Sequence, residues 1–328
     1  MSRKDRRFRR FSKKKSFKEN IVKEEIPIKN VRKTDRNFFV RIYEEEYKKL
    51  FFIPIILLLL SFLVIGVNIA KTGEFMNKGV SLKGGITLTV PSENIVLEDL
   101  EYFLKSKFSN ADISVRGLTD FGVQRAVVIE SSGIDEDELL LVVKEFMGAL
   151  EDYSIETIGS SLGESFFKQT MIAILLAFFF MGLVVFLYFR TVVPSIAVIL
   201  AAFSDMVITL AVVNLMGMKI GTAGIAAFLM LIGYSVDTDI LLSTRVLKRK
   251  GGTVMKRIYE AMKTGLTMNF TTLVAVSVAL IISDSEIISQ IMTIIFIGLI
   301  VDLINTWIQN VSILRYYIEN GKNKKNIY

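Results

Sequence analysis

The chain alternates between long apolar runs and segments rich in charge. Six runs approach or exceed the roughly 18 residues that a helix needs to cross the hydrocarbon core of a bilayer. These runs lie at 51–70, 169–189, 193–215, 220–242, 265–283 and 287–313. Six such runs in one chain are too many for buried helices of a soluble protein. The pattern predicts a polytopic α-helical membrane protein with six transmembrane helices.

The segment between the first two apolar runs has the pattern of a small α+β domain. Four short stretches read as strands, and two amphipathic stretches at 96–108 and 135–150 read as helices. A turn near Asp120–Gly122 joins the second and third strands. The order βαββαβ is that of a ferredoxin-like domain.

Basic residues are distributed unevenly along the chain, and they predict its orientation. The segments 1–50, 244–264 and 315–328 are strongly basic, whereas 71–167 is acidic. Because cytoplasmic loops carry the excess of Lys and Arg, all three basic segments are expected to be cytoplasmic. Only Lys219 lies alone on the other side. The predicted location is the plasma membrane, with both termini in the cytoplasm.

These observations divide the chain into five parts. They are a basic cytoplasmic N-terminal arm at 1–50, a first transmembrane helix at 51–70, an extracytoplasmic α+β domain at 71–167, a five-helix transmembrane bundle at 168–314 and a cytoplasmic tail at 315–328. The arm suits anionic lipid headgroups or a role in topology. Contact with ribosomal RNA is the alternative. No specific nucleic-acid site is predicted.

The composition limits the chemistry that the chain can perform. The 328 residues include no His and no Cys, so no thiol nucleophile, disulfide or Cys-ligated metal is present. Proton chemistry then falls to carboxylates or perturbed lysines. We find no catalytic constellation, and we predict neither an enzyme nor a cofactor or metal site.

Four aspartates lie inside the apolar runs, where charge is costly and therefore marks function. Asp205, Asp237, Asp239 and Asp302 occupy the third, fourth, fourth and sixth runs. Asp237, Asp239 and Asp205 are the candidate proton-relay residues. The fifth segment offers supporting polar positions instead. These are Thr264, Thr267, Asn269, Thr271 and Thr272.

The two aspartates of the fourth run point in different directions, since successive helical residues turn by about 100°. Asp239 belongs to a polar stripe with Ser235 and Ser243, and it is the better candidate for a wet crevice. Asp237 lies one turn from Gly233, which would allow close approach to a neighbouring helix. Either the aspartates take up and release protons, or they are hydrogen-bonded structural groups; both interpretations stay open.

Several motifs resemble those of SecF, the smaller partner in the SecD–SecF complex of protein export. GYSVDTDILLSTR (233–245) is similar to the family's fourth-helix signature, and TGLTMNFTTL (264–273) to its fifth-helix motif. GVSLKGGITL (79–88), with Gly84 and Gly85, and ETIGSSLG (156–163) resemble the motifs that flank the external domain. Three departures from the bacterial pattern resemble an archaeal version. Thr238 and Thr264 replace an aspartate and an arginine, and Ser81 stands at the usual aspartate of the first motif.

The resemblance implies an accessory subunit of the Sec machinery that assists polypeptide translocation, with protons as the coupling ion. The implied partners are a SecD-like six-helix subunit, the Sec channel, the translocating polypeptide and membrane lipids. The first alternative is half of an RND-type exporter of lipids or small molecules. The second is a scaffold that transports nothing and assists assembly of the channel.

Overall fold

Six long helices, each long and apolar enough to cross a membrane, account for the apolar runs of the sequence. The computed structural model describes residues 43–325 except Asn94, Asn110, Phe121, Gly122, Ala149, Glu151, Lys250 and Asp284. The long helices are α4 (Phe52–Thr72), α8 (Ser160–Phe189), α9 (Val192–Leu215), α10 (Thr222–Lys248), α11 (Val254–Ile282) and α12 (Glu286–Ile304). A π-helical segment, η1 (Asn305–Asn310), continues α12 into α13 (Val311–Lys325). The predicted polytopic α-helical class is confirmed.

Several helices extend beyond the runs that predicted them. Helix α8 begins at Ser160 rather than 169, and α11 begins at Val254 rather than 265. The added turns are polar, as in the basic first turns of α11. Hydropathy identifies only the part of a helix that is apolar enough for the bilayer core. Backbone hydrogen bonds extend the helix beyond that part.

The N-terminal arm predicted at 1–50 lies outside the described residues except for its last part. Within it, Tyr47–Leu50 forms a short helix, α3. The lipid or RNA contacts of the arm, and the turn residues Phe121 and Gly122, stay predictions.

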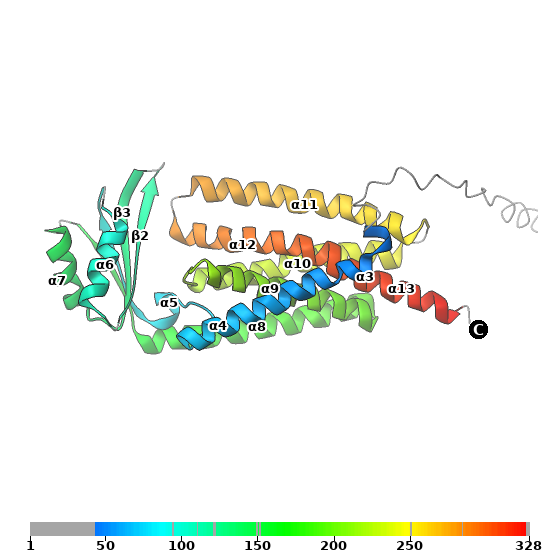
Figure 1. The fold of residues 1–328 in the computed structure, drawn as a ribbon, viewed down its shortest axis with the longest axis horizontal. Coiled ribbons are helices and arrows are strands. Elements are labelled where there is room, and N and C mark those ends of the chain that lie inside the picture. The colour runs from blue at the N-terminus through cyan, green and yellow to red at the C-terminus, as the bar shows by residue number, and fades with distance from the viewer. Residues whose placement is uncertain are drawn as a thin grey trace, which may run out of the picture. The chain divides into compact units, whose positions relative to one another are not determined.

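Helices α9 and α10 occupy the centre of the bundle. More than half of the residues in the most apolar stretch of each are buried, whereas α4, α8 and α11 face mostly outward. Helix α12 packs against α9, α10 and α11, and α8 and α4 both pack on α9; Figure 1 shows these helices side by side. A polar group on α9, α10 or α12 can therefore be fully shielded from lipid by the chain itself.

The segment between α4 and α8 forms the predicted α+β domain. Its elements are β1 (Gly85–Pro91), α6 (Leu97–Lys107), β2 (Asp112–Asp120), β3 (Val123–Ser132), α7 (Glu136–Met147) and β4 (Ser154–Ile158). The four strands pair antiparallel in the order β2-β3-β1-β4. Alternate apolar residues of β1 and β3 pack with α6 and α7 in one core. The element order is the one that the sequence predicts.

A close backbone crossing joins this domain to the bundle at Gly84 and Gly163. A Cβ atom on Gly163, in the first turn of α8, would lie 2.5 Å from the backbone nitrogen of Gly84. Gly84 has φ of 84°, and a Cβ there would lie 2.4 Å from Ser160 Cα. Gly85 is equally crowded by the carbonyl of Ser131. The two glycine motifs of the sequence therefore meet in space, where only glycine fits.

Backbone and amide hydrogen bonds fasten the same junction from the other side. Ile220, just before α10, donates to the carbonyl of Asn77 at 2.7 Å and accepts from the N–H of Gly79 at 2.9 Å. Asn214, near the end of α9, donates to the carbonyl of Phe75 at 2.9 Å. The chain that enters the domain is thus held by the α9–α10 loop.

We predict that Gly163→Ala destabilises the protein by about 1–3 kcal/mol, the range for overpacking a tight contact. The φ of this helical position suits alanine, so the substitution tests space alone. Gly159→Ala is the matched control, because a Cβ at Gly159 meets nothing within 4 Å. Thermal unfolding in mild detergent measures both variants, and equal midpoints would contradict the close crossing.

Candidate functional site

Three aspartates meet in the middle of the bundle, each from a different helix. Asp205 lies on α9, Asp239 on α10 and Asp302 on α12, and each has an exposed fraction of 0%. The three carboxyls are close enough for their charges to interact. None of them forms an ion pair with a lysine or arginine in the described part of the chain. A buried charge without a counter-ion is costly, so the cluster depends on hydrogen-bond donors.

The donors to Asp205 and Asp239 come mainly from the last membrane helix. Asn305 Nδ2 donates to Asp205 Oδ1 at 2.7 Å, and Asn310 Nδ2 donates to Asp239 Oδ1 at 2.7 Å. Ser235 Oγ, on α10, donates to Asp205 Oδ2 at 2.5 Å. The second oxygen of Asp239 is buried and has no hydrogen-bond partner among the described residues.

Thr306 connects two of the carboxyls. Its Oγ1 lies 2.9 Å from Asp239 Oδ1 and 3.0 Å from Asp302 Oδ1. A hydroxyl has a single hydrogen, so it can donate fully to only one carboxylate. The second contact becomes a full hydrogen bond when that carboxyl carries a proton and donates to the hydroxyl oxygen. The geometry therefore accommodates one shared proton between Asp239 and Asp302.

The π-helical segment η1 supplies most of these groups. Its residues Asn305, Thr306, Gln309 and Asn310 are all buried. A π-turn widens the helix locally, and such turns occur mostly at functional sites. Here the wider turn lets consecutive polar side chains reach α9 and α10 together.

Helix α11 contributes one amide and one glycine. Asn269 Nδ2 donates to Asp302 Oδ2 at 3.0 Å. Gly265 provides the space for the ring of Trp307, since a Cβ at Gly265 would lie 2.4 Å from the Trp307 ring. Trp307 belongs to η1, so Gly265 fixes the position of the segment that carries the donors.

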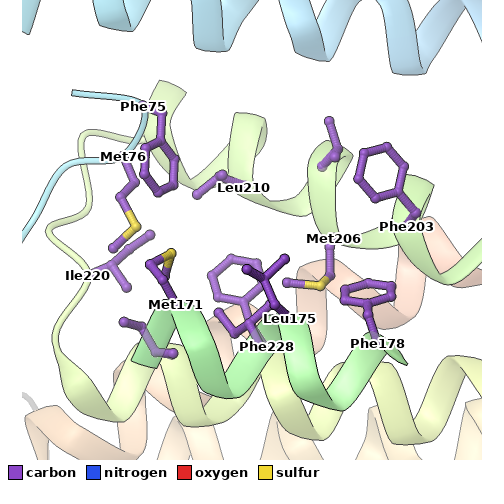
Figure 2. A pocket seen from close by; sticks show the side chains of 13 residues that line it. Phe75, Met76, Met171, Leu175, Phe178, Phe203, Met206, Leu210, Ile220 and Phe228 are labelled. Carbon is purple, nitrogen blue, oxygen red and sulfur yellow. The ribbon is translucent and has the colours of Figure 1, made fainter. Parts of the chain in front are cut away.

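An apolar cavity of about 420 Å³ lies on the side of α9 that faces away from the aspartate cluster. Figure 2 shows Phe203, Met206 and Leu210 of α9 facing it, together with Met171 and Phe178 of α8. All residues that line it are apolar. The cavity suits hydrocarbon, and it is chemically unlike the aspartate cluster one helix away.

A second charged site lies at the junction with the α+β domain. Lys219, between α9 and α10, donates to Asp112 Oδ1 at 2.8 Å, and Lys83 approaches Asp112 Oδ2 at 3.4 Å. Burial alone would raise the pKa of Asp112, but the hydrogen bond and charge of Lys219, with those of Lys83, hold it below its ordinary value. The isolated lysine of the sequence is therefore an ion-pair partner of the domain.

Comparison with known proteins places the chain in a family. The model of the SecD/SecF protein-export membrane protein C-terminal region matches residues 140–320. SecF of Pyrococcus furiosus is 36% identical over 94% of this chain and 99% of its own length. SecF of Methanocaldococcus jannaschii is 40% identical over 86% of this chain and 99% of its own length. The chain belongs to the SecF family of protein-export membrane proteins.

The solved structures agree with this assignment at the level of fold. The crystal structure of SecDF from Thermus thermophilus, a translocon-associated membrane protein, superposes with a TM-score of 0.66 at 23% identity. The match covers 88% of this chain and 39% of that one, so the chain spans well under half of that protein. The family consists of protein-export membrane proteins, in agreement with the expectation that this chain is not an enzyme.

The predicted proton-relay residues separate into two groups. Asp205 and Asp239 lie in the cluster, and both are completely buried within the described part of the chain. Asp237 is exposed on the outer face of α10, so the two aspartates of α10 diverge as predicted. Gly233 makes no close approach to another helix of the described structure, because a Cβ there meets nothing within 4 Å.

The supporting positions of α11 also separate. Asn269 joins the cluster, whereas the four threonines donate to carbonyls of their own helix. Thr264 bonds to Glu260, Thr267 to Lys263, and Thr271 and Thr272 to Met268. These hydroxyls hydrogen-bond only to carbonyl groups of α11, and they contact none of the three carboxyls.

Sequence reasoning noted Asp302 but left it out of the proton-relay residues, and it missed its neighbours on the last helix. A signal was present, because polar residues recur there at helical spacing. They are Asp302, Asn305, Thr306, Gln309 and Asn310. In a membrane helix such a stripe predicts a buried polar contact.

We predict that Asn269→Leu destabilises the protein by about 1–2 kcal/mol, because it leaves a buried oxygen of Asp302 without its donor. Thr267→Val should have little effect, since this exposed hydroxyl bonds only to its own helix. Thermal unfolding in detergent compares the two variants, and a Thr267→Val loss as large as that of Asn269→Leu would contradict the assignment.

Acid should weaken the contact between Lys219 and Asp112. Since the pKa of Asp112 is lower in the folded state, the stabilisation is present above about pH 3.9, the unfolded value, and disappears as the pH falls through the lowered pKa. Because Asp112 is partly exposed, we expect the contact to contribute only about 0.5 kcal/mol to the free energy of unfolding. Lys219→Met should reduce this pH dependence to the part that Lys83 supplies, whereas Lys105→Met, which breaks an ion pair within α6, should leave it unchanged. Unfolding midpoints at pH 7 and pH 3 measure the difference.

Proposed function

We propose that this chain is an accessory subunit of the Sec machinery that uses the proton gradient to assist translocation of polypeptides across the plasma membrane. The family assignment and the SecDF-like fold support the role in export. The shared contact of Thr306 with Asp239 and Asp302 is the observation that carries proton coupling. We place both termini in the cytoplasm and the α+β domain outside, following the distribution of basic residues.

Proton coupling follows from the charge balance of the cluster. Three carboxylates without a cation would repel one another, and each proton added removes one charge. The donors are already arranged around the carboxyls, so a change in proton number would alter which groups donate. Asn305, Thr306 and Asn310 all lie on η1, and that segment would move first.

Helix α12 offers a physical connection from the cluster to the α+β domain. At its far end, Gln290 donates to the carbonyl of Lys219 at 2.6 Å and accepts from the N–H of Gly221 at 3.3 Å. Lys219 in turn binds Asp112 of the domain. A shift of α12 caused by protonation of Asp302 would thus reach the domain through two polar contacts. We propose that this motion acts on the emerging polypeptide.

The outer face of α10 is the proposed contact surface for a SecD-like six-helix subunit. Asp237 lies near the middle of this membrane helix and is exposed, which is costly against lipid. Ala226 and Gly233 share the exposed face and allow close packing of a partner helix. A polar group of the partner would satisfy Asp237.

Two other functions remain distinguishable. The apolar cavity beside α9 is the observation that favours an exporter of lipids, since hydrocarbon would fit there. In a scaffold that only assists channel assembly, the three buried aspartates would serve the folding of the bundle and nothing else. Both alternatives predict export that is insensitive to the proton number of the cluster.

We predict that Asp239→Asn and Asp302→Asn lower export of signal-bearing proteins about tenfold or more while the subunit still folds, because an amide cannot bind and release a proton. Thr264→Val is the matched control in the same bundle and should export normally. Secretion in a strain that depends on the variant subunit measures the effect. Copurification with the six-helix partner in mild detergent reports folding and assembly.

Three results would count against the proposal in different ways. Normal export by Asp239→Asn, Asp302→Asn and their combination would favour the scaffold. Normal secretion together with retained lipid in a depleted strain would favour the exporter. Failure to recover a six-helix partner would remove the proposed surface on α10.

A further inference from the structure

The apolar cavity beside α9 is closed at its deep end by aromatic rings from three helices. Phe203 of α9 lies 6.4 Å from Phe62 of α4 and 6.5 Å from Phe178 of α8, measured between ring centroids. Phe62 lies halfway along α4, so this end of the cavity is near the middle of the bilayer. Above it, the wall formed by α8 includes the exposed Leu175, which Figure 2 shows beside the cavity. The cavity therefore has a closed end inside the membrane and a side that lipid can reach.

The other end of the cavity lies on the side of the α+β domain. There Phe75 lines the cavity and packs on Phe167, with 6.0 Å between the ring centroids. The carbonyl of Phe75 accepts a hydrogen bond from Asn214, near the end of α9. From Phe203 to Asn214 the helix rises by about 16 Å, which is about half of the roughly 30 Å thickness of the hydrocarbon core. The cavity therefore spans the hydrocarbon part of one leaflet.

The cavity is too narrow for a helix, whether from a partner subunit or from a translocating polypeptide. Spread over its length, the volume of about 420 Å³ gives a mean cross-section of roughly 26 Å², about a third of that of a helix about 10 Å across. A single hydrocarbon chain that lies along α9 fits this shape. Because such a chain is already in an apolar medium, its binding depends on close packing and on the contacts of its headgroup.

Two lysines lie at the level where the headgroup of such a lipid would be. Lys78 Nζ lies 4.5 Å from the centroid of the Phe167 ring, and 3.2 Å from a carboxylate oxygen of Glu74. An ammonium group has three hydrogens, so this ion pair leaves two of them for another acceptor. Lys168 is exposed and lies one turn before Met171 on α8, on the face that lines the cavity. Lysines at the membrane surface attract anionic headgroups.

We propose that the cavity holds one acyl chain of an anionic phospholipid from the leaflet on the side of the α+β domain, with the phosphate bound by Lys78 and Lys168. The chain lies along α9 and ends against the ring of Phe203, while the second acyl chain of the lipid stays in the bilayer. This site does not rest on the proposed function, because it requires neither export nor proton coupling.

Photo-crosslinking locates the acyl chain directly. The full chain, with its copurifying partner, is reconstituted into vesicles of phosphatidylglycerol in which a fraction of the lipid carries a diazirine at the end of one acyl chain. Light attaches this lipid to the residues that the chain end contacts, and mass spectrometry of peptides identifies them. We expect labels at the deep end of the cavity, on Phe178, Phe203 and Met206. Labels confined to outward residues of α8, such as Leu176 and Phe180, would overturn the proposal.

A variant that fills the cavity tests the same site by exclusion. Leu210 lines the cavity between its two ends, so Leu210→Trp should lower labelling of the deep end about tenfold. Leu215→Trp is the matched control, because Leu215 is exposed on the same helix and does not line the cavity. Equal labelling of the two variants would overturn the proposal. Labelling that appears only after the partner is removed would show that the partner fills the cavity, and it would overturn the proposal as well.

A second set of variants leaves the packing inside the cavity unchanged and covers a loss of folding by Leu210→Trp. Lys78→Gln and Lys168→Gln should each lower labelling of the deep end about fivefold. Lys107→Gln is the matched control, because Lys107 also lies over a phenylalanine ring and pairs with a glutamate, but within the α+β domain. Labelling that is equal in all three variants would overturn the proposal.

Discussion

The structure depends on the burial of three carboxyls in a membrane bundle without a neutralising cation within the described residues. Burial of charge in this way is unfavourable unless hydrogen-bond donors surround it. The chain meets this constraint with amides and hydroxyls, chiefly Asn305, Thr306 and Asn310 on one π-helical segment and Asn269 on α11. Gly265 is part of the same solution, since it leaves room for Trp307 and so sets where that segment lies.

The constraint also links the cluster to the α+β domain. Helix α12 carries Asp302 at one end and Gln290 at the other, and Gln290 is bonded to the loop that holds Lys219. The glycines at 84 and 163 press the domain against the start of α8 on the other side. In the proposed mechanism, these contacts would transmit a change of charge inside the bundle to the domain.

Much of this architecture can be predicted from the sequence, and the reasons are physical. Length and hydropathy identify the six helices, and alternating patterns identify the strands and helices of the domain in order. The divergence of Asp237 and Asp239 follows from helical geometry. The polar first turns of α8 and α11 cannot be predicted from hydropathy. Hydropathy measures how apolar the side chains are, and it does not detect the backbone hydrogen bonds that extend a helix.

The composition of the cluster is harder to predict. The threonines of α11 and Asn269 are all polar, so the sequence does not separate them. A threonine hydroxyl readily hydrogen-bonds to a carbonyl of its own helix, whereas an asparagine such as Asn269 does so less readily and bonds to another helix. The pairing of Lys219 with Asp112 joins residues far apart in the sequence and leaves no local pattern. The widened turn at 305–310 likewise depends on packing against Gly265 and on the carboxyls of α9 and α10.

The central claim is that the cluster holds an exchangeable proton between Asp239 and Asp302. Infrared difference spectroscopy of the reconstituted complex, with aspartate carboxyls labelled by carbon-13, detects a protonated carboxyl directly. The account predicts a protonated carboxyl band that shifts with the label and disappears in Asp302→Asn. A spectrum in which that variant leaves every protonated carboxyl band unchanged would contradict it.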